Sequence, residues 1–567
     1  MASMFPSGPS TYDELYTSLD TDLRAMADDT PDMIANIIAH VRFGVEAVSA
    51  WSGVEMPREM WRQLRIGVAP YLDGTQFRDA TQQPLCVFTK QCEKEPWLRD
   101  GLIESARQQP HVSGCVFGTV GSRLSKENDA VIDDFIGAPL PASATPEQKK
   151  ARAKQYEELQ SMCIKEADAL FPRGNSSHCF CHGRQCNTKC YPRIAPGTFL
   201  HPKRLMVSHA SPECVGFLRG LGTGLGAAHK SMKAHVLWQV EEHKETKDMI
   251  RDMSFSENSG NWKAEVLVRP NQQHQRVIIV RICPSFQARS FSRRRTLVAG
   301  LSKFRIIWEG PTNDAEVQRD FAQFVGRSLV VDGRVYMQAS EEERTSEFRK
   351  LFSSRGMKLP ENHSFKWTIE DIEQFASPGL RLRLDDYVRE WRASDPAPNV
   401  PTFLDLDHWL ESQCGSMQDL FPHQLTHGTN LELVKDADGK EHARIATAGE
   451  HLTAQGYIIY PLHDSLNAER WTVSPLLQIM NKLNWSRRQR THASGNGICI
   501  PSYLAFVLYI LSRSKRRPDP TIDRLVDGTA SDSDNEDGDQ VSPTKSQGAM
   551  ACESADCIPQ LHDDDFY

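Results

Sequence analysis

The chain has 567 residues, of which 39% are hydrophobic and 25% charged, and its formal net charge is −8. This length predicts two to four domains, and the composition is that of a soluble globular protein, which argues against a membrane-spanning or wholly disordered chain. The acidic excess is local. Residues 519–567 hold 13 Asp or Glu against two Lys or Arg, which leaves a formal charge of about +3 on the first 518 residues.

The pattern of residues 11–140 predicts mostly helix. Thr30 followed by Pro31 is typical of a helix start, and apolar residues recur at helical spacing in the segment MIANIIAHVRFGVEAVSAW. Pro and Gly at 137–146 interrupt this pattern and predict a boundary near residue 140. Thr145 followed by Pro146 then predicts an amphipathic helix to about residue 170.

The second part of the chain alternates between loop, helix and strand patterns. Residues 171–214 are rich in Pro and Gly, which excludes long regular elements, and a long helix is expected over 216–253. Strands are expected between 262 and 337, in KAEVLVR, RVIIVRI, FRIIW and SLVVDGRVYMQ, the last with an Asp-Gly turn. Helices are expected again in EEERTSEFRKLF, TIEDIEQFA and DLDHWLESQ.

The run ICIPSYLAFVLYIL at 498–511 is the most apolar of the chain. We interpret it as a buried helix, because 14 residues that include a proline are too short to span a bilayer. No stable membrane span is therefore expected. The opening residues, MASMFPSGPSTYDELYTSL, show no secretory signal, so we expect an intracellular protein with reduced cysteines.

These patterns predict an α+β, helix-rich, multidomain protein with a loop-rich zinc-binding segment and a disordered acidic C-terminal tail. The expected parts are a helical N-terminal domain at 1–140; a helix, a Cys/His zinc loop and a long helix at 141–260; a basic α+β domain at 261–395; a mixed C-terminal domain at 396–518; and the tail at 519–567.

The segment HCFCHGRQCNTKC is the main candidate for chemistry. A Cys-x-Cys-x4-Cys-x3-Cys run places four thiolates on a short turn-rich loop, and zinc prefers four such ligands in a tetrahedron. We predict a structural zinc ion on Cys179, Cys181, Cys186 and Cys190, with Cys214 or one of the histidines of this region (His178, His182, His201 and His209) replacing one of them. The alternative is a set of ordinary free cysteines.

The sequence of this segment resembles two known zinc-binding regions. Its Cys179-x-Cys181-x4-Cys186 part resembles the post-SET zinc motif of histone methyltransferases, but none of the upstream catalytic motifs of that family is present. Together with the APGTFLHPKRL segment that follows, it also resembles the zinc region of adenoviral single-stranded-DNA-binding proteins. Neither resemblance assigns a role to a residue.

Three long windows contain Lys and Arg but no Asp or Glu: 171–212 with six basic residues, 266–308 with nine, and 471–517 with eight. Phenylalanines interleave with the arginines of the second window, which is the pairing that nucleic-acid grooves use for phosphates and bases. The candidate nucleic-acid-binding residues are Arg281, Arg289, Arg293, Arg294, Arg295, Lys303, Arg305, Phe286, Phe291, Arg487, Arg488 and Arg490. The alternative is a pair of buried strands joined by a solvated basic loop.

We interpret the whole as a zinc-stabilised nucleic-acid-binding protein with little sequence specificity, acting on RNA or single-stranded DNA in a nucleus or in a viral replication or packaging complex. We expect a binding protein more than an enzyme, because no nucleophilic side chain lies in a turn typical of catalytic motifs. The alternatives are a zinc hydrolase, a nuclease that uses acids such as Asp405 and Asp407, and a capsid-like assembly protein. The acidic tail is a candidate site for a protein partner, and a homo-oligomer is a further expectation.

Overall fold

The computed structural model describes residues 8–53, 56–72, 85–108, 114–141, 143–172, 175–188, 201–212, 225–262, 264, 269–290, 293–354, 365–411, 417–422, 428–519 and 522. Met1–Asp519 form one compact unit and Pro520–Tyr567 a second. All the elements below belong to the first unit, and the predicted disorder of the tail concerns residues outside the described ranges, apart from Asp519 and Ile522.

A seven-stranded mixed sheet organises this unit, with the strand order β3-β2-β1-β6-β7-β9-β8. The strands are β1 (Val45–Ala50), β2 (Cys86–Cys92), β3 (Cys115–Phe117), β6 (Leu205–Ala210), β7 (Met253–Ser259), β8 (Gln275–Ile282) and β9 (Arg295–Ser302). The first five strands of that order run parallel, and β9 runs antiparallel to both of its neighbours. One sheet therefore joins residues 45–302, across the boundaries expected near 140 and 260.

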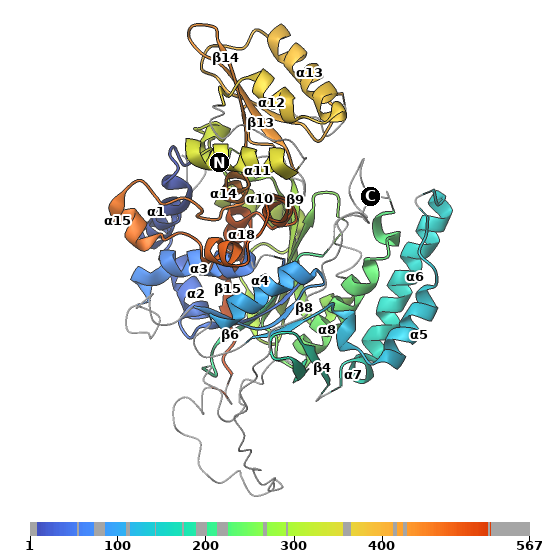
Figure 1. Ribbon diagram of the computed structural model, residues 1–567. Coiled ribbons are helices and arrows are strands. Elements are labelled where there is room, and N and C mark those ends of the chain that lie inside the picture. The colour runs from blue at the N-terminus through green and yellow to red at the C-terminus, as the bar shows by residue number, and fades with distance from the viewer. Residues whose placement is uncertain are drawn as a thin grey trace, which may run out of the picture. The chain divides into compact units, whose positions relative to one another are not determined.

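Helices cover both faces of the sheet, as parallel strands require (Figure 1). One face packs against α1 (Glu14–Asp29), α2 (Pro31–Val41), α3 (Met56–Val68), α10 (Asp314–Val325) and α18 (Ile500–Ser512). The other packs against α5 (Lys126–Ile136), α6 (Pro146–Lys165), α7 (Ala167–Leu170) and α8 (Met232–Lys247). Strand β1 shows the alternation, because Val45 and Ala47 contribute to the first core and Ala50 to the second.

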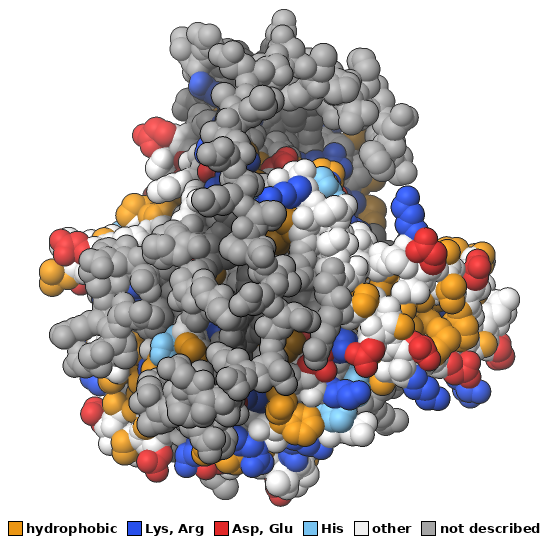
Figure 2. All heavy atoms as spheres, turned by 90° about the horizontal axis from the view of Figure 1, so that it is seen from below, with side chains coloured by type: hydrophobic (Ala, Val, Ile, Leu, Met, Phe, Trp, Pro, Cys, Tyr) orange, Lys and Arg blue, Asp and Glu red, His pale blue; other side chains and the backbone are white. Residues whose placement is uncertain are grey.

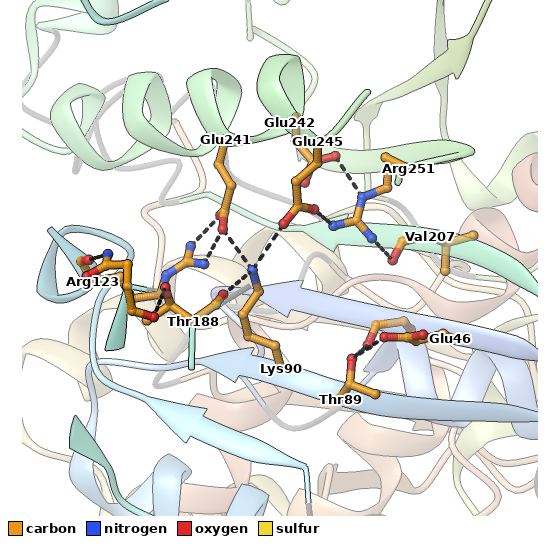
Figure 3. Close-up of polar contacts among 12 residues, drawn as sticks. Glu46, Thr89, Lys90, Arg123, Thr188, Val207, Glu241, Glu242, Glu245 and Arg251 are labelled. Carbon is orange, nitrogen blue, oxygen red and sulfur yellow. Dashed lines mark hydrogen bonds and ion pairs between the residues drawn. The ribbon is translucent and has the colours of Figure 1, made fainter. Parts of the chain in front are cut away.

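Helix α8 crosses its face of the sheet with three buried glutamates, Glu241, Glu242 and Glu245 (Figure 3). Lys90 of β2 reaches Glu241 at 2.7 Å and Glu245 at 3.5 Å. The guanidinium of Arg123 binds both oxygens of Glu241, and that of Arg251 pairs with Glu242 and Glu245. Buried charges are stable only when they are paired in this way.

Beyond the large sheet, residues 365–445 form a subdomain with its own core. Its sheet has the order β12-β11-β13-β14, made of β12 (Met417–Gln418), β11 (Thr402–Asp405), β13 (Asn430–Lys435) and β14 (Glu441–Ile445). Helices α12 (Ile369–Phe375) and α13 (Pro378–Ala393) cover one face of it, and α11 (Glu341–Ser354) adds Phe348 to the same core. Figure 1 shows these elements together, away from the large sheet.

The chain then returns to the first core. The returning elements are α14 (Ala448–Ala454), α15 (Ser465–Arg470), α16 (Pro475–Lys482), α17 (Arg487–Gly495) and α18, and β15 (Ser514–Arg516) pairs with β10 (Ile306–Trp308). The expected buried helix at 498–511 is confirmed as α18. The stretch Arg487–Ser512 is long and apolar enough to cross a membrane, but 78% of its most apolar window is buried inside the protein.

Several expected elements differ from the structure. Helices make up most of the described residues of 11–140, as expected, but the helix that starts at Pro31 is shorter than expected. Helix α2 ends at Val41, Gly44 adopts a left-handed φ of 81°, and β1 follows where the helix was expected to continue. The strands β8 and β10 are confirmed. Most of KAEVLVR lies outside the described residues, and Ala264 within it is helical.

Two further expectations are wrong for local reasons. The Asp332-Gly333 turn does not join two strands, because the Asp332 side chain accepts a hydrogen bond from the Arg334 amide and caps a short 3-10 helix, Gly333–Tyr336. No helix starts at 405, because Asp405 is the last residue of β11 and the chain turns after it.

Candidate active site

The order of the strands reverses between β1 and β6. From β1 the chain proceeds outward through β2 and β3, and it then crosses to β6 on the opposite side of β1. In doubly wound sheets ligands bind at this position, in the crevice outside the carboxyl ends of the strands. A small pocket, open to solvent, lies there. It is lined by Ser49, Ala50, Trp51, Ser52, Gly53, Met56, Pro57, Leu98, His209, Ala210, Ser211, Ala493, Asn496, Gly497 and Ile498. We refer to it as the switch-point pocket.

The loop after β1 forms one wall of the switch-point pocket in an unusual conformation. Trp51 has a φ of 53° and Gly53 a φ of 51°, both in the left-handed region. This region is unfavourable for a tryptophan, and such residues concentrate at functional sites. A Cβ atom added to Gly53 would meet no heavy atom of the described residues within 4 Å, so the backbone there faces open space.

Glu93 fixes this loop from the end of β2. Its Oε2 accepts a hydrogen bond from the Gly53 amide at 2.9 Å, and its Oε1 accepts one from the Glu95 amide at 3.0 Å. Burial raises the pKa of Glu93, although the backbone amides that it binds act in the opposite direction. Each carboxylate oxygen can accept a further hydrogen bond, so Glu93 can bind a hydroxyl group presented by a ligand.

His209 of β6 lies beneath the pocket as a neutral and fixed side chain. Its Nε2 accepts from the Trp61 indole at 2.9 Å, so Nδ1 carries the proton and donates to the Tyr503 hydroxyl at 2.9 Å. Burial, with a smaller effect of the Arg251 charge, lowers the pKa of His209 to about 3. His209 is therefore not a zinc ligand of the cysteine loop, and it remains uncharged at neutral pH.

A buried polar cluster adjoins the pocket at the ends of β6 and β7. The Ser211 hydroxyl, on the pocket wall, donates to Glu257 Oε2 at 3.0 Å, and the other carboxylate oxygen pairs with the guanidinium of Arg295 on β9. Asn258 donates from its side chain to the Pro212 carbonyl at 3.0 Å, which fixes the chain after β6. Glu257, Asn258 and Arg295 are all buried. The cluster thus offers an acceptor and a donor next to the pocket.

The turn between α17 and α18 lines one side of the pocket. Arg293 donates to the carbonyls of Gly495 at 3.0 Å and of Gly497 at 2.6 Å, and so holds the turn between α17 and α18. Asn496, Gly497 and Ile498 of that turn line the pocket beside β1. The pocket is therefore built from both ends of the chain.

Several of the expected nucleic-acid-binding residues have partners within the protein. Arg289 binds the Leu15 carbonyl, Lys303 binds that of Gln272, Arg305 pairs with Asp252 and Asp519, Arg487 pairs with Glu347, and Arg490 binds Trp485 and Asn481. Arg281, Arg294, Arg488 and Phe286 are exposed, and Phe291 lies outside the described residues. On the face drawn in Figure 2, described Lys and Arg side chains lie in small groups with Asp and Glu among them.

The structure brings together only part of the expected zinc ligand set. Cys179 and Cys186 lie close together, but with Cys115 of β3 and His182 in place of Cys181 and Cys190. Cys181 is not in this group, and Cys190 lies outside the described residues. Cys115 was missed because it is distant in sequence and contacts the hairpin only after the sheet has formed.

No protein-family model matches this sequence, and no curated protein matches it. Three solved structures illustrate what the fold is similar to. The Dnmt2 methyltransferase of S. pombe matches with a TM-score of 0.35 and 10% identity, over 82% of this chain and 98% of that one. The methyltransferase EhMeth of Entamoeba histolytica matches at 0.33 and 9%, over 82% and 98%. A putative DNA modification methyltransferase from an E. coli prophage matches at 0.33 and 13%, over 82% and 99%.

The functional interpretation of the sequence differs from these findings. The sequence favoured a non-enzymatic zinc-stabilised binding protein, whereas the three solved structures named above are methyltransferases. The structure gives its own reason to correct the interpretation of the sequence. Arg293 and Arg295, two of the arginines assigned to phosphates, are buried and hold the walls of the switch-point pocket and its polar cluster.

Proposed function

We propose that this chain is a methyltransferase that modifies a base in nucleic acid, with S-adenosylmethionine bound in the switch-point pocket. The observation that carries the proposal is the position of this pocket. It lies where the strand order reverses, and Ser211 connects it to the buried Glu257–Arg295 pair. A cofactor site and a substrate-recognition site are thus neighbours.

The side chains around the pocket suit the chemical groups of a nucleoside cofactor. Apolar side chains of Met56, Leu98 and Ile498 offer a surface for a planar ring, and the open space over Gly53 leaves the backbone accessible. Glu93, next to that backbone, can accept hydrogen bonds from ribose hydroxyls, as the acidic residue after the second strand does in dinucleotide folds. When bound, S-adenosylmethionine supplies an activated methyl group.

The Glu257–Arg295 pair suits the edge of a nucleobase. A carboxylate accepts from an exocyclic amine, and a guanidinium donates to a ring carbonyl or nitrogen. Methyltransferases that act on a base extrude it from the helix into a pocket and read it through such hydrogen bonds. Because both side chains are buried, a base that reached them would be separated from water, which strengthens these bonds.

The charge distribution favours a nucleic acid as the source of that base. The first 518 residues carry a formal charge of about +3, and Arg281, Arg294 and Arg488 are exposed. Such residues contact phosphates without reading sequence. RNA and DNA share this chemistry, so both are tested as substrates.

The test is methyl transfer from tritiated S-adenosylmethionine to duplex DNA and to total RNA by the purified full-length chain. We expect incorporation into at least one of the two, and a loss of about 100-fold or more in Glu257→Gln, because a preorganised charged acceptor becomes a neutral amide. Glu309→Gln is the matched control, since Glu309 is exposed and pairs only with Lys515 among the described residues. Thermal unfolding of both variants establishes that they fold.

Two results would overturn the proposal. One is the absence of incorporation into either nucleic acid by a folded chain. The other is full activity in Glu257→Gln, which would exclude the buried pair from substrate recognition.

A further inference from the structure

We propose that Cys115, Cys179, His182 and Cys186 bind one structural zinc ion that fastens the β4–β5 hairpin to the edge of the large sheet. The hairpin consists of β4 (Ser176–Cys179) and β5 (Arg184–Asn187). The four ligand atoms, three Sγ and one imidazole nitrogen, all lie within 4.8 Å of one another.

The distances among these atoms match a tetrahedral site. The Nδ1 atom of His182 lies 3.3 Å from Cys179 Sγ, 3.4 Å from Cys186 Sγ and 3.6 Å from Cys115 Sγ. Zinc bonds of about 2.3 Å to sulfur and about 2.0 Å to nitrogen at tetrahedral angles place sulfur and nitrogen about 3.5 Å apart. The imidazole nitrogen therefore lies at nearly the same distance from all three sulfur atoms, as expected when the four atoms bind one central ion.

The backbone of the hairpin explains this convergence. Cys179 ends β4, His182 lies in the turn, and Cys186 pairs with Ser177 in β5, so Cys179 and Cys186 share a face of the hairpin. Gly183 has a φ of 62° and donates from its amide to the Cys179 carbonyl at 2.8 Å. This left-handed residue closes the turn at little steric cost and directs the imidazole toward the thiols.

The fourth ligand comes from the sheet. Cys115 is the first residue of β3, the edge strand, and the Phe180 amide of the hairpin donates to the Val116 carbonyl at 2.8 Å. A second contact joins the Ser177 hydroxyl to the Ser122 carbonyl at 2.8 Å. The hairpin thus covers a sheet edge that would otherwise offer unpaired backbone groups. An ion shared by β3 and the hairpin would fix this arrangement.

The donor set indicates zinc in a structural role. Three thiolates and one imidazole suit zinc, and they occupy all four positions of the tetrahedron, which leaves none for a substrate or a water molecule. Cys179 is fully buried, and Cys92 and Phe117 form an apolar wall beside it. The site is separate from the switch-point pocket, and its occupancy is measured without reference to any activity.

The first experiment measures zinc per chain by elemental analysis of the full-length protein. We expect about one ion in the wild type and in Cys181→Ser, the matched control, because Cys181 lies on the same loop outside the four ligands. In Cys115→Ser the content should fall about tenfold or more. A wild type without zinc, a Cys115→Ser variant that keeps it, or a Cys181→Ser variant that loses it would overturn the assignment.

The second experiment covers the case in which Cys115→Ser does not fold. Co²⁺ exchanged into the wild type should give the intense d–d and thiolate charge-transfer bands of a tetrahedral site with three sulfurs. Cys115→His, which replaces one thiolate by an imidazole, should retain the metal and shift these bands to shorter wavelength. An unchanged cobalt spectrum in Cys115→His would place Cys115 outside the site and overturn the proposal.

Discussion

At the scale of single residues, a cluster of basic residues in the sequence does not identify the groups that their side chains bind in the folded protein. The run Arg293, Arg294 and Arg295 is an example. Arg293 binds two glycine carbonyls near the C-terminus, Arg294 is exposed, and Arg295 pairs with Glu257. Only Arg295 belongs to β9, of which it is the first residue, and Arg293 and Arg294 precede the strand. Arg293 and Arg295 thus bind groups supplied by distant segments of the chain, whereas Arg294 is open to an external partner.

Because Arg295 is buried and Arg294 is exposed, replacing each of them should change the stability of the protein by different amounts. Arg295→Ala should lower the free energy of unfolding by about 3–5 kcal/mol, because it leaves the buried Glu257 carboxylate without its cation. Arg294→Ala, the control, should change it by less than about 0.5 kcal/mol. Denaturant unfolding of both variants measures the difference, and equal stabilities would contradict the assigned environments.

His235 gives a prediction for pH. It is buried among Trp51, Trp238 and Trp262, and burial lowers its pKa to about 3. The unfolded chain protonates this residue below about pH 6.5 and the folded protein does not, so His235 makes stability fall as the pH decreases from about 6.5 toward 3. At pH 5 this contribution is about 2 kcal/mol relative to pH 7.

His235→Phe removes the titrating group from the same apolar environment. The difference in unfolding free energy between pH 7 and pH 5 should therefore shrink by about 2 kcal/mol in the variant. Unfolding curves of both proteins at the two pH values provide the measurement. An identical pH dependence would show that His235 is protonated in the folded state.

At the scale of elements, helices were more predictable than strands. Helix α6 was expected from its Thr-Pro start and α18 from its apolar run, and the structure confirms both. Helix α8 lies within the helix expected over 216–253 but is shorter. The strands β1, β6 and β7 are buried at every position, so they lack the alternation that identifies a strand exposed on one face. Only Gly44 indicated that α2 ends before β1 begins.

The contact between α8 and the sheet depends on the buried network around Glu241. Burial opposes the ionisation of Glu241, but the charges of Arg123 and Lys90 outweigh it and lower its pKa to about 2. Lys90→Met should cost about 3–5 kcal/mol of unfolding free energy, because Glu241 and Glu245 lose a shared cation.

Lys94→Met is the control for Lys90→Met. Lys94 is exposed and pairs with Glu95 at 3.9 Å, so its loss should cost less than about 1 kcal/mol. Chemical denaturation compares the two variants. A Lys90→Met protein as stable as the wild type would mean that the network contributes no net stability.

At the scale of the whole molecule, the candidate active site combines segments that are far apart in the sequence. The pocket takes residues from the ends of β1 and β6 and from the turn before α18, and the adjoining cluster takes Glu257 and Arg295. None of these residues lies in a recognisable local sequence motif. The basic windows located Arg293 and Arg295, but only the sheet topology places Glu257 beside Arg295.

The acidic tail gives a prediction at this scale. Truncation after Asp519 removes 12 acidic and two basic residues and changes the formal charge from −8 to about +2. We expect tighter binding of nucleic acid at low salt, with a gain that decreases as salt screens the charges. Fluorescence anisotropy with labelled DNA and RNA at two salt concentrations measures the affinities of the full-length and the truncated chain. Equal affinities of both chains at low salt would exclude electrostatic competition by the tail.

The most direct test of the central claim is calorimetric titration of S-adenosylmethionine into the full-length protein. We predict one binding site per chain, with affinity reduced about 10- to 100-fold in Glu93→Gln and unchanged in Glu95→Gln, because the Glu93 carboxylate, and not that of Glu95, accepts the hydrogen bond from the Gly53 amide. The absence of binding by the folded wild type, or equal affinities of all three proteins, would contradict a cofactor site at the switch point.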